Sequence, residues 1–135
     1  DGDVLWTFDA NGNLESVWGN PILENDTLIF SDSAGKLFGL DPVTGEARWQ
    51  TVVSGSVVGG LTAMEDGFVL ATKEGLVKAF DFEGSPLWEA TLEGEIYKAP
   101  ALNDEFVVVG TINGENLLYA FNKNGVQIWS STPKN

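Results

Sequence analysis

Short apolar runs separated by polar turns recur along the whole chain. Residues 16–55 contain four such runs, with Asn, Asp, Ser, Pro or Gly between them. Runs of about four to eight residues with these boundaries are typical of β-strands joined as hairpins. No stretch shows the sustained periodicity of a helix. The expected strands are 17–23, 27–31, 36–41 and 47–52, then 57–64, 68–72, 76–81 and 87–92, and finally 96–102, 106–111, 117–122 and 126–130.

Several of these strands are apolar on both faces. Residues 68–71 (FVLA) and 106–109 (FVVV) lack the alternation that a strand with one solvated face needs, and they suit a sheet covered on both sides. Four strands that repeat about every forty residues are typical of β-propeller blades, which pack face to face around an axis. The sequence therefore predicts an all-β fold of three four-stranded antiparallel blades plus one extra N-terminal strand.

Four tryptophans follow the same period, with spacings of 43, 39 and 41 residues. A similar phrase precedes the last three, in residues 39–49, 79–88 and 120–129. Its Asp or Asn can accept hydrogen bonds from turn amides, and its Gly allows a positive φ between the third and fourth strands. The indole ring is expected to cover the seam with the adjacent blade and to donate its N–H to a turn carbonyl. The expected blade-docking residues are Trp6, Trp49, Trp88, Trp129, Asp41, Asp81, Asn122, Gly45, Gly84 and Gly125.

This phrase resembles Ala-x-Asp-x-x-Thr-Gly-x-x-x-Trp, the repeat phrase of the quinoprotein-type (PQQ-like, BamB-like) β-propellers. Residues 39–49 match it with Gly39 in place of Ala, and the other two copies lack one residue and the Thr. The resemblance extends from Val4 to Trp129. It implies propeller blades in a family that holds both quinone-dependent dehydrogenases and non-enzymatic scaffolds of outer-membrane assembly. It also implies a bacterial protein with an extracytoplasmic location, periplasmic or secreted.

The repeats predict how the chain is divided. Blades 1, 2 and 3 are expected at residues 16–55, 56–94 and 95–135, and residues 1–15 are expected to hold the fourth strand of a preceding blade and a polar link. Three blades are too few to close a ring, since propellers typically carry about four to eight. One explanation is that the chain is a segment of a larger propeller, which we favour because the orphan strand needs a partner. The other is a homo-oligomer that completes a ring.

Composition excludes several classes of partner. The net charge is −13, which repels the phosphates of nucleic acids and anionic membrane surfaces. No apolar run approaches the roughly 20 residues of a membrane-spanning helix. We therefore expect no nucleic-acid partner and no membrane insertion, and we interpret the acidity as an aid to solubility.

Candidate catalytic chemistry is sparse. The chain has no His and no Cys, which removes the commonest general base and all thiolate chemistry. The resemblance implies that a quinone enzyme would carry vicinal cysteines, an Asp base and calcium, and none of these can be assigned. Residues 9–15 place oxygen-bearing side chains at alternate positions, but their Gly does not fit an EF-hand loop. We expect solvated turn carboxylates, no catalytic residue, no metal and no cofactor.

Two regions remain as candidate ligand surfaces. Trp18 lies off the period and aligns with Val58 and Tyr97 on the first strands, where packing between blades is the expected role and ligand binding the alternative. The loops between second and third strands differ between repeats while the strands agree, as a grafted function would require. The candidate residues are Trp18, Tyr97, Lys98, Asp32, Lys73, Glu74, Asn113 and Glu115.

These observations favour a non-catalytic binding or scaffold module. Its partners would be proteins or peptides, which would dock on one loop face or on an exposed strand edge. Two alternatives remain open. The chain could be a fragment of a dehydrogenase that uses pyrroloquinoline quinone, or a small-molecule or carbohydrate sensor that uses Trp18 and Tyr97.

Overall fold

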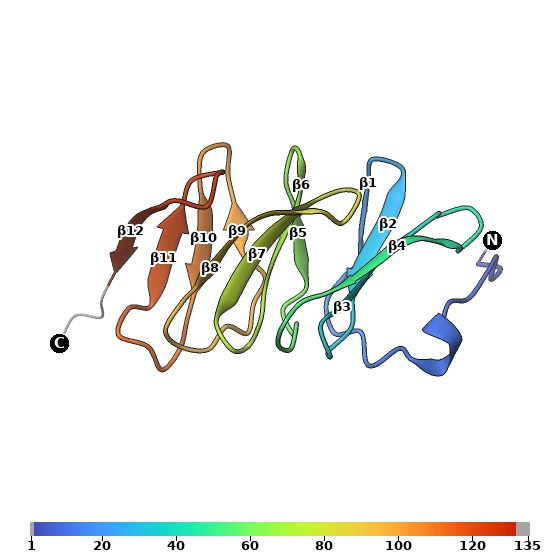
Figure 1. The fold of residues 1–135 in the computed structure, drawn as a ribbon, viewed down its shortest axis with the longest axis horizontal. Coiled ribbons are helices and arrows are strands. Elements are labelled where there is room, and N and C mark those ends of the chain that lie inside the picture. Colours follow the sequence, from blue (N-terminus) through green and yellow to red (C-terminus); the bar gives the residue numbers. More distant parts are fainter. Residues whose placement is uncertain (1, 132–135) are drawn as a thin grey trace.

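The computed structural model describes residues 2–131 as three four-stranded antiparallel sheets (Figure 1). Each sheet runs in chain order from a first to a fourth strand, which confirms the all-β class and the four-strand repeat. The helical content of the described residues is one 3-10 turn, η1 (Ala10–Gly12). The strands are β1 (Ile22–Glu24), β2 (Thr27–Ser31), β3 (Lys36–Leu40), β4 (Ala47–Val52), β5 (Leu61–Ala63), β6 (Gly67–Ala71), β7 (Leu76–Asp81), β8 (Pro86–Thr91), β9 (Ala101–Leu102), β10 (Val107–Gly110), β11 (Leu118–Phe121) and β12 (Gln127–Ser131).

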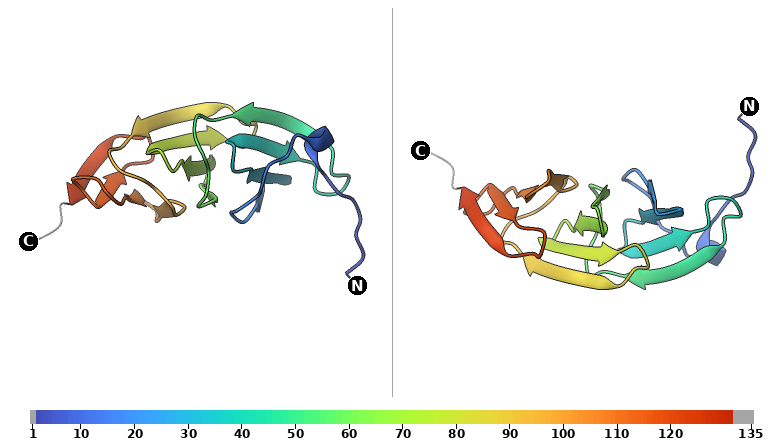
Figure 2. Two further views of the ribbon diagram at one scale, coloured as in Figure 1. Left: turned by 90° about the horizontal axis from the view of Figure 1, so that it is seen from below. Right: turned by 90° about the horizontal axis from the view of Figure 1, so that it is seen from above.

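The three sheets, called blades 1 to 3 in chain order, stand side by side in a curved row. Figure 2 shows the fourth strands β4, β8 and β12 along the convex side, and the short first strands β1, β5 and β9 toward the concave side. Each sheet therefore turns one face toward each neighbour. This is the arrangement of consecutive propeller blades.

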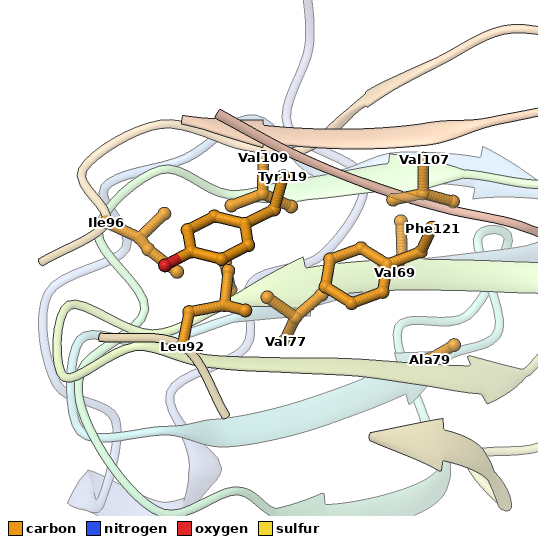
Figure 3. Close-up of a cluster of buried hydrophobic side chains, with 10 residues drawn as sticks. Val69, Val77, Ala79, Leu92, Ile96, Val107, Val109, Tyr119 and Phe121 are labelled. Carbon is orange, nitrogen blue, oxygen red and sulfur yellow. The ribbon is translucent and has the colours of Figure 1, made fainter. Parts of the chain in front are cut away.

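Apolar side chains fill the two seams between blades. Blade 2 illustrates the point, because every residue of β6 is buried. Phe68 on one face of β6 stacks on Trp49 of blade 1, with ring centroids 6.1 Å apart. On the other face, Val69 and Val77 pack against Val107, Val109 and other residues of blade 3 (Figure 3). Because both faces are covered, the central strands need no polar alternation.

The first strand of each blade is shorter than the sequence predicts. The expected strands 17–23, 57–64 and 96–102 shrink to β1, β5 and β9. The backbone before these strands lies against the backbone of a neighbouring blade. A Cβ on Gly19 would lie 2.2 Å from Gly60 Cα, and one on Gly59 would lie 2.3 Å from the carbonyl carbon of Lys98. Val57 and Ile96 are nevertheless buried, so their apolar character reflects packing and not strand pairing.

The N-terminal segment lies along the free face of blade 1. Residues 3–8, the predicted extra strand, are not paired in a sheet. Their side chains still pack as those of a neighbouring blade would, since Phe8 meets the ring of Phe38 edge-on at 5.2 Å and Trp6 joins the same cluster. The assignment of this segment to a preceding blade remains a prediction.

Candidate functional site

Three tryptophans each donate an equivalent hydrogen bond to the element that follows in the array. The indole Nε1 of Trp49 donates to the Phe82 carbonyl at 2.8 Å, and that of Trp88 donates to the Lys123 carbonyl at 3.0 Å. Trp6 of the N-terminal segment donates to the Pro42 carbonyl at 3.0 Å. Every acceptor lies in the turn between the third and fourth strands of the following blade. Trp49 and Trp88 therefore couple blades 1 and 2 to their successors, and Trp6 couples the N-terminal segment to blade 1.

A glycine in each of these turns lies beneath the incoming indole. Gly45, Gly84 and Gly125 have φ values of +76°, +83° and +82°. A Cβ at these positions would lie 2.5, 2.7 and 2.5 Å from the rings of the incoming tryptophans, Trp6, Trp49 and Trp88 respectively. The turn therefore needs glycine for two reasons, the left-handed backbone and the space for the ring.

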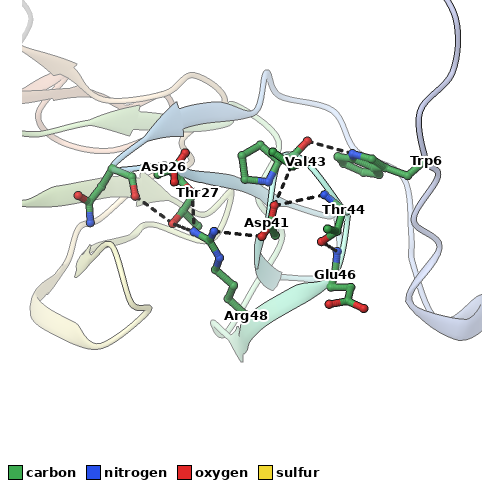
Figure 4. Close-up of polar contacts among 10 residues, drawn as sticks. Trp6, Asp26, Thr27, Asp41, Val43, Thr44, Glu46 and Arg48 are labelled. Atoms are coloured by element: carbon green, nitrogen blue, oxygen red, sulfur yellow. Dashed lines mark hydrogen bonds and ion pairs between the residues drawn. The ribbon is translucent and has the colours of Figure 1, made fainter.

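The Asp or Asn of each phrase organises the same turn. Asp41 Oδ1 accepts hydrogen bonds from the amides of Val43 and Thr44 at 2.8 and 3.2 Å (Figure 4). These two bonds, together with the nearby Arg48 guanidinium, lower the pKa of Asp41 below its ordinary value of 3.8. Asp81 and Asn122 accept two amide hydrogen bonds each in the equivalent turns of blades 2 and 3. Asn serves as well as Asp because both offer the same oxygen acceptor.

The outer face of blade 3 is uncovered in the described part of the chain. Trp129, the counterpart of Trp88, is 42% exposed, and Leu118 is 43% exposed. Leu118 takes the place that Val77 holds in blade 2, where the side chain is fully buried at the seam with blade 3. This face thus has the apolar side chains of a seam between blades, but no described blade covers it.

The residues predicted to bind a ligand do not lie together in one site. Trp18 is 67% exposed, so the expected packing between blades is wrong for the three blades described. The reason is that the segments before the first strands of blades 1 and 2 meet through the backbones of Gly19 and Gly60. This contact leaves no space between the two segments for an indole. Lys73, in the loop between β6 and β7, lies over the ring of Tyr97, with its Nζ 5.7 Å from the ring centroid.

The remaining exposed candidates make local contacts. Glu74 accepts a hydrogen bond from the Ser56 amide, and Asn113 donates to the Glu95 carboxylate. Lys98 and Glu115 are exposed. These residues line the ends of the blades without converging on one point, so no single pocket gathers the set.

Asp32 differs from the sequence expectation of a surface residue, because its side chain is fully buried. Its carboxylate accepts hydrogen bonds from the amides of Ala34, Lys36 and Glu15 at 3.0, 2.9 and 3.1 Å. The Lys36 ammonium lies 3.5 Å away. Asp32 therefore holds the N-terminal segment against blade 1 and is not available to a partner.

A groove at the seam of blades 2 and 3 was missed by the sequence analysis. Its volume is about 610 Å³, within the range of about 300–1,000 Å³ that ligand pockets occupy. The only sequence signal is a difference between repeats, with Leu87 where blade 1 has Arg48 and Lys123 where blade 2 has Phe82. The lining residues are Ala63, Met64, Glu65, Asp66, Leu87, Leu102, Asn103, Asp104 and Lys123.

Two further findings concern metal ions and membranes in residues 2–131. No group of three or more His, Cys, Asp or Glu side chains there is placed to hold a metal ion. No helix in this range is long and apolar enough to cross a membrane.

Stacked four-stranded sheets joined by these tryptophan links define an array of quinoprotein-type β-propeller blades. Residues 1–58 and 54–135 both match the family model described as outer membrane protein assembly factor BamB, and the chain belongs to this family.

The relatives of this chain include proteins of two kinds. The chain is 36% identical over 82% of its length to the outer membrane protein assembly factor BamB of Nitrosomonas eutropha, of which it covers 27%. It is 26% identical over 82% of its length to the BamB of Burkholderia pseudomallei, covering 29% of it. It is also 28% identical over 96% of its length to a tetrathionate hydrolase of Acidithiobacillus ferrooxidans, again covering 29%. The chain thus spans less than a third of these relatives.

Solved structures agree on the fold. BamB from Moraxella catarrhalis matches with a TM-score of 0.71 and 21% identity, over 87% of this chain and 38% of that one. A europium-containing methanol dehydrogenase matches with a TM-score of 0.77 and 19% identity, over 98% and 27%. The computationally designed Ika4 protein matches with 0.74 and 18%, over 96% and 79%. Assembly factors, enzymes and a designed protein therefore share this arrangement of blades.

Proposed function

We propose that this chain is a non-catalytic binding module of the BamB type, whose partners are proteins or peptides. The observation that carries the proposal is the match to the BamB family, which extends over the whole chain in two stretches. The name of the relatives supports a role in the assembly of outer-membrane proteins. An extracytoplasmic location follows from the same proposal.

The geometry supports binding through a rigid scaffold. Three tryptophan links and two filled apolar seams hold the blades, so the loops at both ends are presented from a fixed frame. Loops on rigid scaffolds are the usual place for binding residues. The candidate binding residues, on the loops and on the segments before the first strands, are Trp18, Tyr97, Lys98, Lys73, Glu74, Asn113 and Glu115.

We further propose the division into blades at residues 16–55, 56–94 and 95–135, with residues 3–8 acting as the fourth strand of a preceding blade. The Trp6 link to Pro42 supports this, because it matches the links made by Trp49 and Trp88. The uncovered outer face of blade 3 would accept one more blade, from the same polypeptide or from a second copy.

Deletion of the encoding gene in its host tests the proposed role. The amounts of folded β-barrel proteins in the outer membrane should fall and should be restored by the wild-type gene. Fractionation should place the protein outside the cytoplasm. Unchanged barrel proteins in the deletion strain would overturn the assembly role.

An enzymatic role is the second candidate, favoured by the tetrathionate hydrolase among the relatives. It is tested by incubating the purified protein with pyrroloquinoline quinone and calcium, and separately with tetrathionate. Stoichiometric quinone binding, or turnover of an alcohol or of tetrathionate, would support this candidate and contradict the non-catalytic module.

A further inference from the structure

The groove at the seam of blades 2 and 3, called here the seam groove, lies at the end of the array formed by the hairpin tips and the turns before the fourth strands. Figure 1 shows the β5–β6 and β9–β10 hairpins and the β7–β8 and β11–β12 turns on one side of the molecule. The loops between second and third strands, the docking face expected from the sequence, lie at the opposite end. The seam groove is therefore a separate surface.

Four of the nine residues that line the groove are apolar and are called its floor here, and the other five are polar or charged. Ala63 and Met64 come from the end of β5, Leu102 ends β9, and Leu87 lies on β8 with 49% of its surface exposed. A groove of about 610 Å³ with this lining has room for one or two aliphatic side chains. Methionine adds adaptability, because its unbranched side chain can repack around different shapes.

Differences between the repeats explain why the groove is open at this seam. In blade 1 the Arg48 guanidinium bridges its own hairpin and turn, donating to Thr27 Oγ1 at 2.9 Å and to Asp41 Oδ2 at 3.3 Å. Leu87 occupies this position in blade 2 and cannot form such a bridge. Phe82 packs into the seam of blades 1 and 2. Its counterpart in blade 3 is Lys123, which instead donates to the Asn103 carbonyl at 2.7 Å.

The rim of the groove is acidic. Glu65, Asp66 and Asp104 line it and are exposed at the two hairpin tips, against the single ammonium of Lys123. Three carboxylates against one ammonium leave two negative charges beside an apolar floor. A cationic partner would be attracted to this rim, and an anionic one would be repelled.

We infer that the seam groove binds a peptide segment in which basic side chains flank aliphatic ones. The aliphatic side chains fill the space between Met64, Leu87 and Leu102, and the flanking Lys or Arg side chains pair with Glu65, Asp66 and Asp104. This inference deepens the proposed binding function and rests on it, since it names the surface and the chemistry of the partner.

The test is a titration of the purified 135-residue chain with three fluorescein-labelled peptides of about nine residues. One alternates Lys and Leu, the second Glu and Leu, and the third Lys and Ser. The Lys-Leu peptide should bind tightest, because it alone satisfies both the floor and the rim. Its affinity should fall severalfold from about 0.05 M to about 0.5 M sodium chloride, because salt screens the exposed carboxylates.

The decisive variant is Leu87→Arg, which installs the residue that blade 1 carries at the same place. The new side chain should fill the groove and lower the affinity for the Lys-Leu peptide at least about tenfold, a typical effect of losing a central contact. Ile128→Arg is the matched control, because Ile128 holds the same position in blade 3, is also 49% exposed, and lies outside the groove. It should change the affinity by less than about twofold.

A second pair of variants covers the case in which Leu87→Arg fails to fold. Glu65→Gln combined with Asp104→Asn should weaken the Lys-Leu peptide and reduce its salt dependence, since both charges lie on the rim. Glu46→Gln combined with Glu93→Gln removes two exposed charges elsewhere and should leave the affinity unchanged.

The outcomes separate the groove from the wider function. Equal affinity for the Lys-Leu and Glu-Leu peptides, no binding at all, or equal loss in a variant and its control would overturn the seam groove. None of these results bears on the gene-deletion test of the assembly role. Conversely, normal barrel proteins in the deletion strain would overturn that role without changing the peptide titration.

Discussion

The indole Nε1 of Trp88 donates a hydrogen bond to the carbonyl oxygen of Lys123 at 3.0 Å, across the seam between blades 2 and 3. The two residues are 35 positions apart, close to one repeat. The same link spans 36 positions from Trp6 and 33 from Trp49. Each link therefore joins equivalent positions in successive repeats, and its contribution can be measured one blade at a time.

Replacement of Trp88 by Phe removes the hydrogen bond and keeps part of the ring. We expect the free energy of unfolding to fall by about 1–2 kcal/mol, from the lost hydrogen bond and the smaller buried area. Chemical denaturation followed by circular dichroism measures the change. Trp18→Phe is the control, since Trp18 is 67% exposed, and it should cost less than about 0.5 kcal/mol. Equal effects at the two sites would contradict the proposed docking role.

Replacement of Gly84 by Ala tests the contact beneath the indole. The new Cβ would require a residue at φ +83° and would lie 2.7 Å from the Trp49 ring. Gly12 has the same φ of +83° with nothing within 4 Å, so Gly12→Ala isolates the backbone cost. We expect about 1 kcal/mol for Gly12→Ala and about 2–4 kcal/mol for Gly84→Ala. Thermal and chemical unfolding of both variants provides the comparison, and similar losses would show that the ring does not require glycine.

Asp41 should make the stability of blade 1 depend on pH. Its pKa is lowered from 3.8 in the folded chain by the amides of Val43 and Thr44 and by Arg48. A lowered folded pKa means that the contribution is fully present above the unfolded pKa and is lost as pH falls through the folded value. Asp41→Asn keeps the oxygen acceptor but does not titrate. The difference in unfolding free energy between wild type and this variant should therefore be constant near neutral pH and change below about pH 4. A difference that stays constant down to pH 2 would refute the assignment.

Loss of the Asp32 carboxylate should release the N-terminal segment. Asp32→Ala leaves the amides of Ala34, Lys36 and Glu15 without their acceptor, and we expect a loss of about 3 kcal/mol. Hydrogen exchange of residues 2–15 should accelerate more than that of blades 2 and 3. Asp3→Ala removes an exposed carboxylate and should affect neither measurement. Uniform acceleration over all three blades would show that Asp32 does not act locally.

The outer face of blade 3 should drive self-association if a second copy covers it. Light scattering coupled to size-exclusion chromatography should then give twice the chain mass of 14.5 kDa. Leu118→Glu should return the protein to a monomer, because Leu118 is 43% exposed on this face. Val43→Glu, at a position that is 77% exposed in a turn, should leave the mass unchanged. A wild-type monomer at all concentrations would exclude self-association and favour another blade of the same polypeptide.

The candidate site shows where inference from sequence stops. The turn phrase predicts its own hydrogen bonds, because Asp41 and the amides that donate to it lie within three residues of each other. The location of Asp32 and Trp18 could not be predicted in this way. Burial of Asp32 depends on the Glu15 amide, 17 positions away. Exposure of Trp18 depends on the close approach of Gly19 to Gly60.

The all-β class, the four-strand repeat and the residues of the tight turns could be predicted from the sequence, because hydrophobic period and turn chemistry are local properties. The length of the first strands, the burial of Asp32 and the opening of the seam groove became visible only in the folded chain. These depend on how neighbouring blades meet. Leu87 and Lys123 come from different repeats and line one groove, which cannot be read from either repeat alone.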